Sequence, residues 1–155
     1  MVLADACFNV THPSFKENFE GILNESKKLG VGHFFCPAAE KKDIDEVIKF
    51  SSIYKEISCG IGIHPHHANE VDAELLMKLE TLINQEDITA IGEIGLDYYR
   101  DFQQKITQQE SFELQLKLAS DHKMPVFLHN REAFKDFCSI LKKYFSNLPG
   151  GIVHC

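Results

Sequence analysis

The chain has 155 residues, of which 44% are hydrophobic and 25% charged, and its formal net charge is −7. This length and composition are typical of one globular domain. The negative charge argues against a broad basic surface for bulk nucleic-acid binding, but not against an enzyme that neutralises one or two phosphates with metal ions. No apolar run reaches the roughly 20 residues that cross a bilayer. The N-terminus also lacks a basic region before a long apolar stretch. We therefore expect an intracellular protein, cytoplasmic or nuclear, with no membrane partner and no obligate protein partner.

Strand-like and helix-like segments alternate along the chain. Short apolar runs predict strands at residues 2–9, 31–36, 57–63, 88–93, 125–129 and 151–155. Apolar residues at helical spacing predict helices at residues 14–29, 42–55, 72–84, 106–123 and 133–145. This alternation indicates right-handed βαβ units and a parallel sheet, which is an α/β architecture.

Two parallel architectures fit this alternation. A closed (β/α)₈ barrel needs eight strands and typically about 250 residues, whereas six strands are visible in this sequence. An open doubly wound sheet could be formed from six strands. The sequence contains neither a GxGxxG motif nor a Walker A loop, so the nucleotide-binding versions of the open sheet lose support.

The most informative segment is AIGEIGLDYY at residues 90–99, an apolar strand that delivers Glu93 and is expected to break at Gly95. The same arrangement recurs with histidine: GIGIH ends at His64, PVFLH at His129 and GIVH at His154. Parallel-barrel enzymes carry their catalytic groups at the carboxyl ends of their strands. The pattern therefore predicts that these side chains share one edge of the sheet.

Glu93, His129 and His154 form a candidate metal site. Imidazole nitrogen and carboxylate oxygen suit zinc, manganese or iron, and with water also magnesium. Each residue alone is more simply a polar strand end with a backbone partner, but the three together favour metal binding. An open site of this kind can activate water for hydrolysis. Asp97, in the same loop as Glu93, either supports a ligand histidine or caps a turn.

Further candidates flank this site. His64 and His66 lie in a proline-containing loop, where they can bind substrate phosphate, bind metal or be solvated. Arg131 follows the fifth strand and can offer a bidentate fork to a phosphate. Its alternative is an ion pair with Glu132 or Asp136 at the start of the next helix.

Several motifs resemble, in order and spacing, the TatD family of metal-dependent deoxyribonucleases. They are DACFNVT at 5–11, GIHPH at 62–66, AIGEIGLDY at 90–98, PVFLHNR at 125–131 and GIVHC at 151–155. The resemblance extends over essentially the whole chain. It implies a TIM (β/α)₈ barrel of the metal-dependent hydrolase type, with about six of the eight strands present in this chain. It also implies a hydrolase that cleaves DNA phosphodiester bonds, plausibly as an exonuclease.

The resemblance also implies roles for individual residues. The residues on the family's catalytic and metal-ligand positions are Glu93, His129 and His154. The residues expected to bind substrate are His64, His66 and Arg131. The implied cofactor is a divalent cation, Mg²⁺ first, with Zn²⁺ or Mn²⁺ as alternatives.

The first strand departs from the pattern of many family members. They carry Asp-x-His-x-His there, whereas this chain has Asp5 followed by Cys7 and Asn9. The branch closest to TatD itself also has a non-histidine residue and Asn at these positions. Because Asn9 is a weak ligand at best, the departure argues against a full two-metal site.

Family members continue beyond the GIVHC-like strand and supply an aspartate there. We therefore expect residues 1–155 to form a single incomplete barrel domain, a fragment or truncated product with exposed strand edges, which would not be a stable, active enzyme by itself. Two alternatives stay open. One is an amidohydrolase-like enzyme acting on an amide, ester or small phosphoester, and the other is an inactive truncated product.

Overall fold

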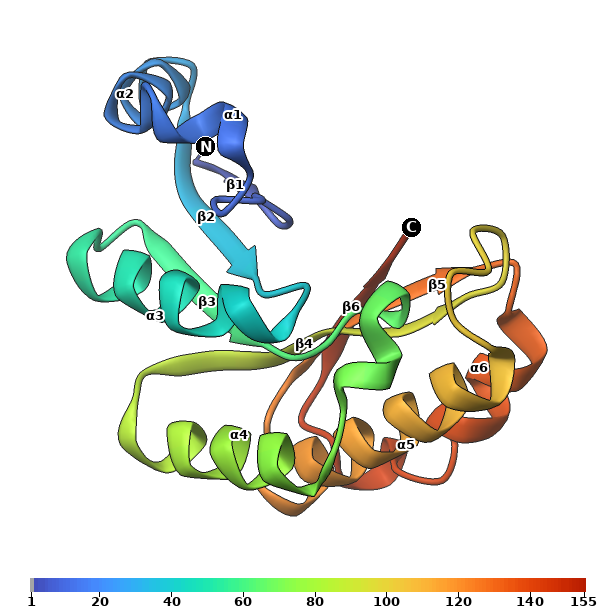
Figure 1. The fold of residues 1–155 in the computed structure, drawn as a ribbon. Helices are drawn as coiled ribbons and strands as arrows, with labels where there is room; N and C mark the ends of the chain where they lie inside the picture. Colours follow the sequence, from blue (N-terminus) through green and yellow to red (C-terminus); the bar gives the residue numbers. More distant parts are fainter. Residues whose placement is uncertain (1) are drawn as a thin grey trace.

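The computed structural model describes residues 2–155 and shows a curved parallel sheet with helices along one side (Figure 1). Within these residues the six strands are β1 (Leu3–Asp5), β2 (Val31–Pro37), β3 (Ile57–Ile61), β4 (Ile88–Asp97), β5 (Val126–Arg131) and β6 (Gly151–His154). Each strand pairs in parallel with the next one in sequence, in the order β1-β2-β3-β4-β5-β6. A doubly wound sheet would reverse direction at a switch point. The order is instead that of consecutive strands in a TIM-barrel wall, as predicted.

The connections between strands are helical. The α-helices are α1 (Pro13–Lys16), α2 (Phe19–Lys28), α3 (Ile44–Ile53), α4 (Ala73–Gln85), α5 (Lys105–Asp121) and α6 (Phe134–Leu141). The 3₁₀ turns are η1 (Lys41–Asp43), η2 (Pro65–Glu70) and η3 (Phe145–Asn147). Helices α3 to α6 lie along the outer side of the sheet (Figure 1). None of the helices in residues 2–155 has both the length and the apolar character needed to span a membrane.

The core lies between the sheet and these helices. Helix α5 buries Phe112, Leu116 and Ala119, which recur at helical spacing and face β4. The ring of Phe112 also stacks on that of Phe137 from α6, with centroids 5.2 Å apart. Strand β4 is buried at every position from Ala90 to Asp97, as is typical of an inner strand of a parallel sheet.

Strand β4 runs further than its sequence indicates. The expected break at Gly95 is wrong, because β4 continues to Asp97 and Gly95 pairs with His129 of β5. Gly95 has a φ of +149°, and a Cβ placed there would collide with the carbonyl oxygen of His129. Glycine is therefore required here for a close approach of two strands rather than for a turn.

Among the other boundaries, three differ most from those predicted. The helix expected at 14–29 is two helices, because Asn18 (φ −145°, ψ 41°) leaves the helical region between α1 and α2. The first strand is confined to Leu3–Asp5, and the last helix ends at Leu141 instead of residue 145. None of these differences moves a candidate site residue, since all lie away from the carboxyl ends of β3 to β6.

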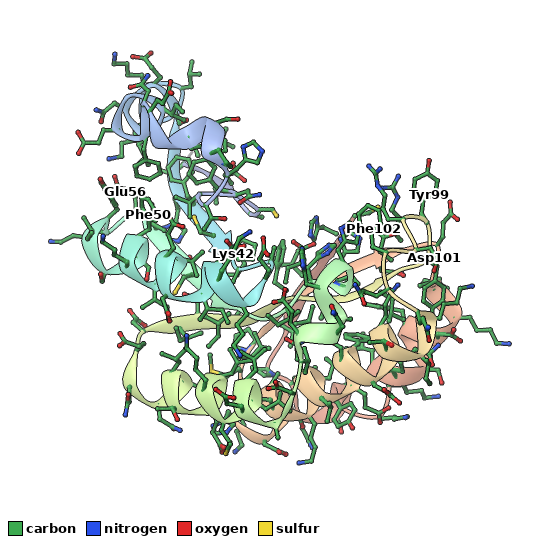
Figure 2. The ribbon with its side chains drawn as sticks, in the orientation of Figure 1. Lys42, Phe50, Glu56, Tyr99, Asp101 and Phe102 are labelled. Atoms are coloured by element: carbon green, nitrogen blue, oxygen red, sulfur yellow. The ribbon has the colours of Figure 1, made fainter. Side chains whose placement is uncertain are left out.

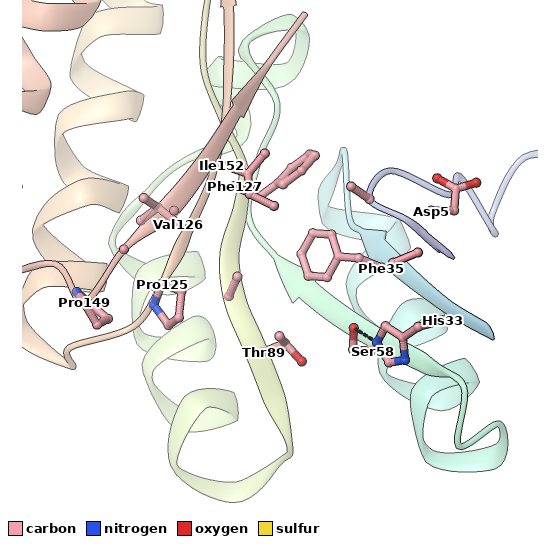
Figure 3. A pocket seen from close by; sticks show the side chains of 15 residues that line it. Asp5, His33, Phe35, Ser58, Thr89, Pro125, Val126, Phe127, Pro149 and Ile152 are labelled. Carbon is pink, nitrogen blue, oxygen red and sulfur yellow. Dashed lines mark hydrogen bonds between the residues drawn. The ribbon is translucent and has the colours of Figure 1, made fainter. Parts of the chain in front are cut away.

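The face of the sheet turned away from the helices is hollowed by an open cavity of about 460 Å³ (Figure 3). Its walls are mostly apolar, with Phe35 and Phe127 approaching from opposite sides at a ring-centroid distance of 5.1 Å. Ile152 of β6 closes one flank, and His33 forms a hydrogen bond with Ser58 on the other. The histidines and the carboxylate of the candidate site do not line this cavity, so the polar groups meet elsewhere.

Candidate active site

Glu93 lies at the centre of a cluster of imidazole rings. Its carboxylate oxygen Oε1 is 2.9 Å from Nδ1 of His129, 2.8 Å from Nε2 of His154 and 3.4 Å from Nε2 of His64. Glu93, His129 and His154 lie on the neighbouring strands β4, β5 and β6. His64 lies between β3 and η2, and β3 is the other neighbour of β4. Because the strands are parallel and adjacent, their carboxyl ends coincide, and the structure brings all four predicted residues together.

The cluster favours particular protonation states. Burial by itself would raise the pKa of the Glu93 carboxyl, but hydrogen bonds from His129, His154 and His64 outweigh it, so the pKa is lowered. Burial lowers the pKa of His64 below its ordinary 6.5, with Glu93 partly opposing the effect. Glu93 is therefore an anion and His64 a neutral imidazole near neutral pH. These are the forms in which the two side chains bind metal ions.

The cluster has the donor set of a metal site. Ligand atoms of His64, Glu93 and His129 all lie within 4.8 Å of one another. Nε2 of His129 is buried and has no hydrogen-bond partner within residues 2–155. A buried polar atom without a partner is costly, so a ligand that reaches this nitrogen would stabilise the site. The residues present thus fit a divalent cation.

A second group of donor atoms overlaps the first. The sulfur of Cys7 lies within 4.8 Å of ligand atoms of Glu93 and His154, although Cys7 as a whole is exposed. Desolvation of the sulfur, together with the charges of Glu93 and Asp5, raises the pKa of the thiol to about 12. The thiol is therefore neutral in the metal-free protein, and it would have to lose its proton to bind a cation.

His66 belongs to a hydrogen-bonded pair beside the cluster. Its Nε2 is 2.7 Å from Oδ2 of Asp97, an atom that also lies 3.4 Å from Nε2 of His129. The other oxygen of Asp97 accepts hydrogen bonds from the backbone N–H groups of Tyr99 and Arg100. Burial would raise the pKa of Asp97, but these backbone bonds and His66 lower it. Asp97 therefore lies against two histidines through one oxygen and caps a turn through the other.

Two buried glutamines on α5 hold the backbone of the site, and sequence reasoning assigned them no such role. Gln115 accepts a hydrogen bond from the N–H of Ile63, just before His64, and donates to the carbonyl of the same residue. Gln108 makes the same pair of bonds to the backbone of Asp97. A signal was available, since the two glutamines are seven residues apart and so share one face of the helix with its apolar residues.

Arg131 lies at the end of β5 beside an exposed aromatic ring. Its guanidinium carbon is 3.9 Å from the ring centroid of Tyr99, a cation–π arrangement. Asp136, considered as an ion-pair partner, instead accepts hydrogen bonds from the Tyr98 hydroxyl and from Gln109. Figure 2 shows Tyr99 on the loop between β4 and α5. Arg131 is thus placed at the rim of the site, outside the cluster around Glu93.

Comparisons with known proteins agree with the motifs. The family model described as "TatD related DNase" matches residues 4–155. A curated relative from Pantoea ananatis, named 3′-5′ ssDNA/RNA exonuclease TatD, is 32% identical over 152 residues, covering 97% of this chain and 58% of the relative. A relative of the same name from Yersinia pseudotuberculosis is 32% identical over 155 residues.

Solved structures give the same result. A TatD homologue from Escherichia coli superposes with a TM-score of 0.85 at 29% identity, covering 92% of this chain and 56% of that one. A TatD-family hydrolase from Entamoeba histolytica has a TM-score of 0.85 at 27% identity, covering 100% and 58%. The chain thus spans a little over half the length of the relatives it matches.

Proposed function

Since the chain belongs to the TatD family, we propose that it acts as a metal-dependent nuclease on the phosphodiester bonds of single-stranded DNA or RNA, releasing nucleotides from the 3′ end. The observation that carries the proposal is the convergence of three imidazole nitrogens on one carboxylate oxygen, Oε1 of Glu93, at the carboxyl edge of the sheet. This edge is where barrel enzymes hold their reacting groups.

The proposed ligands are Glu93, His129 and His154. Nε2 of His64 also lies 3.4 Å from Oε1 of Glu93. Mg²⁺ is the cation proposed from the family, and the imidazole-rich set also suits Mn²⁺ and Zn²⁺. When bound, the cation supplies positive charge for the phosphoryl oxygen and makes water a stronger nucleophile.

The remaining residues position the substrate in this proposal. Asp97 holds the ring of His66 through a 2.7 Å hydrogen bond, so His66 faces the phosphate in a fixed orientation. Arg131 adds a permanent positive charge at the rim, which attracts phosphate locally in a chain whose net charge is −7. Gln108 and Gln115 keep the backbone of Asp97 and Ile63 in place while the site is occupied.

A nuclease assay tests the proposal. A single-stranded oligonucleotide labelled at its 5′ end is incubated with the protein in EDTA and then with Mg²⁺, Mn²⁺ or Zn²⁺. We expect stepwise shortening from the 3′ end only when a cation is present. Absence of nucleotide release with all three cations, from protein that melts cooperatively, would overturn the assignment. Hydrolysis of a nitrophenyl ester or amide without nuclease activity would point to the amidohydrolase-like alternative.

A further inference from the structure

We propose that the loop between β4 and α5, residues 98–104, is a base-stacking platform for single-stranded nucleic acid, built on the exposed rings of Tyr99 and Phe102. The inference rests on the proposed nuclease function and identifies a part of the substrate, the nucleobase, that the cluster around Glu93 does not contact. Figure 2 shows both rings on this loop.

Both rings of the platform are largely exposed to solvent. Tyr99 is 55% exposed and Phe102 is 62% exposed, although they lie only three residues apart in the sequence. Aromatic rings that gather at the surface beside a polar site are typical of binding surfaces. Single-stranded nucleic acids bind such rings, because every base presents a flat π face that can stack on them.

Phe102 is also continuous with the candidate site. Its ring lies edge-on to that of His66, with centroids 4.7 Å apart. His66 is in turn 4.2 Å from the ring of His64, which faces Glu93. The side chain of His66 alone therefore separates Phe102 from His64, which belongs to the cluster around Glu93. A nucleotide whose phosphate lies at the cluster can place its base against Phe102.

Two arginines bring positive charge to the Tyr99 ring, and Asp101 in the same loop offsets one of them. The guanidinium of Arg131 is 3.9 Å from the ring centroid of Tyr99, and that of Arg100 is 5.9 Å away. Two arginines beside an aromatic ring offer positive charge to the phosphate backbone and a flat surface to a base. The positive charges of these two arginines contrast with the net charge of −7 of the whole chain.

Hydrogen bonds to neighbouring residues hold the loop in place. The backbone N–H groups of Tyr99 and Arg100 donate to Asp97, and the Tyr98 hydroxyl donates to Asp136. Gln108 donates to the carbonyl of Gln103 near the other end of the loop. Little conformational entropy is then lost when a base stacks on the exposed rings, which favours binding.

A purely structural role for Phe102, as a cover over His66, makes a different prediction. Removal of a cover would change binding of all oligonucleotides alike, because it would disturb His66 and the phosphate position. Removal of a stacking ring weakens binding only where the substrate carries bases. The two roles are separated by comparing an ordinary oligonucleotide with an abasic one of the same length.

The test measures binding by fluorescence anisotropy in EDTA, and again in Mg²⁺ with a hydrolysis-resistant phosphorothioate backbone. We expect Phe102→Ala to weaken binding of the base-containing strand by about fivefold to a hundredfold and Tyr99→Ala to act in the same direction. Binding of the abasic strand should change little, and Phe102→Trp should restore the affinity. The matched control is Phe145→Ala, since Phe145 is 69% exposed on η3, away from the site.

Three outcomes would overturn the platform: equal binding of the two strands by the unmodified protein, equal loss for both strands in Phe102→Ala, or unchanged affinity in that variant. Metal-dependent nucleotide release combined with base-independent binding would remove the platform and leave the proposed function standing. Absence of both release and binding would remove the two together.

Discussion

The candidate site has two sides that differ in burial and in bonding. On β3 to β6, Glu93 and His129 are buried and hydrogen-bonded to each other across the sheet, over 36 positions in the sequence. On the β1 side, Cys7 and Asn9 are exposed, and the hydrogen bonds of Cys7 N–H and of the Asn9 side chain reach only two residues along the chain, to Asp5 and Thr11. The backbone of this segment is anchored by the buried Phe8 and Val10, so the two sides differ in how their polar side chains are held.

This difference indicates where the chemistry depends on the fold. A buried charge is expensive unless several partners compensate for it, so each residue near Glu93 is constrained by its neighbours. An exposed side chain with local bonds can be replaced at little cost. We therefore expect substitutions on β4 and β5 to have large effects and substitutions after β1 to have small ones.

The largest effect is expected from Glu93→Gln. The amide keeps the size of the side chain but loses the anion on which three imidazoles converge, so kcat/KM for nucleotide release should fall by about a thousandfold or more. Mn²⁺ affinity, measured by titration calorimetry, should fall with it, while circular dichroism shows a retained fold. The control is Glu110→Gln, an exposed position on α5. Activity within about tenfold of the unmodified protein would show that Glu93 is not central.

Gly95→Ala should lower the free energy of unfolding by about 2–4 kcal/mol, because its Cβ would collide with the backbone of His129 in addition to the strain of a φ of +149°. Urea denaturation measures the change. Gly150→Ala is the matched control, since Gly150 has a φ of +156° and no atom near the position of a Cβ. Equal losses in the two variants would mean that backbone strain alone is responsible and that β4 and β5 are not in close contact there.

Gln115→Met should cost about 1–3 kcal/mol of stability, since it keeps the side-chain volume but leaves the N–H and C=O of Ile63 without partners in a buried position. Because Ile63 precedes His64, KM should also rise. Thermal melting and steady-state kinetics test both effects. Gln85→Met, at the exposed end of α4, is expected to change neither.

The pH dependence of stability should reveal the burial of His64. The pKa of His64 is lowered in the folded state, so as pH falls below about 6.5 the unfolded chain takes up a proton that the folded chain does not. Stability therefore decreases with acidification through this range and is regained at higher pH. Melting temperatures of metal-free protein should fall between about pH 7.5 and about pH 5.5. His64→Gln should flatten this slope, and an unchanged slope would contradict the assigned burial effect.

The smallest effect is expected from Cys7→Ala. The thiol has a pKa of about 12 and is neutral near pH 7, so its removal should change kcat/KM by less than about threefold with Mg²⁺. A larger loss would show that the β1 side contributes a metal ligand and that the two sides of the site are more alike than their burial suggests.

Much of the site could be predicted because its residues follow a simple rule. Glu93, His129 and His154 each end an apolar run, and parallel strands align their carboxyl ends, so their proximity follows from the order of the strands. The pairing of His66 with Asp97 could not be predicted in this way, because His66 lies in the turn η2 and Asp97 lies on a continuation of β4 that depends on tertiary packing. The position of Gln115 on the apolar face of its helix was visible in the sequence, but its partner was not, because the backbone of Ile63 has no signature there.

The sequence by itself determined the parallel α/β architecture and the polar side chains that follow its apolar runs, because hydrophobic periodicity and residue type are local properties. Only the tertiary structure decided that β4 passes through Gly95 to Asp97, because that path depends on how closely β5 approaches. It also decided which nitrogen faces which oxygen around Glu93, and that Tyr99 and Phe102 are left exposed beside them. These are properties of contacts between distant segments, and they are set by packing rather than by any single stretch of the chain.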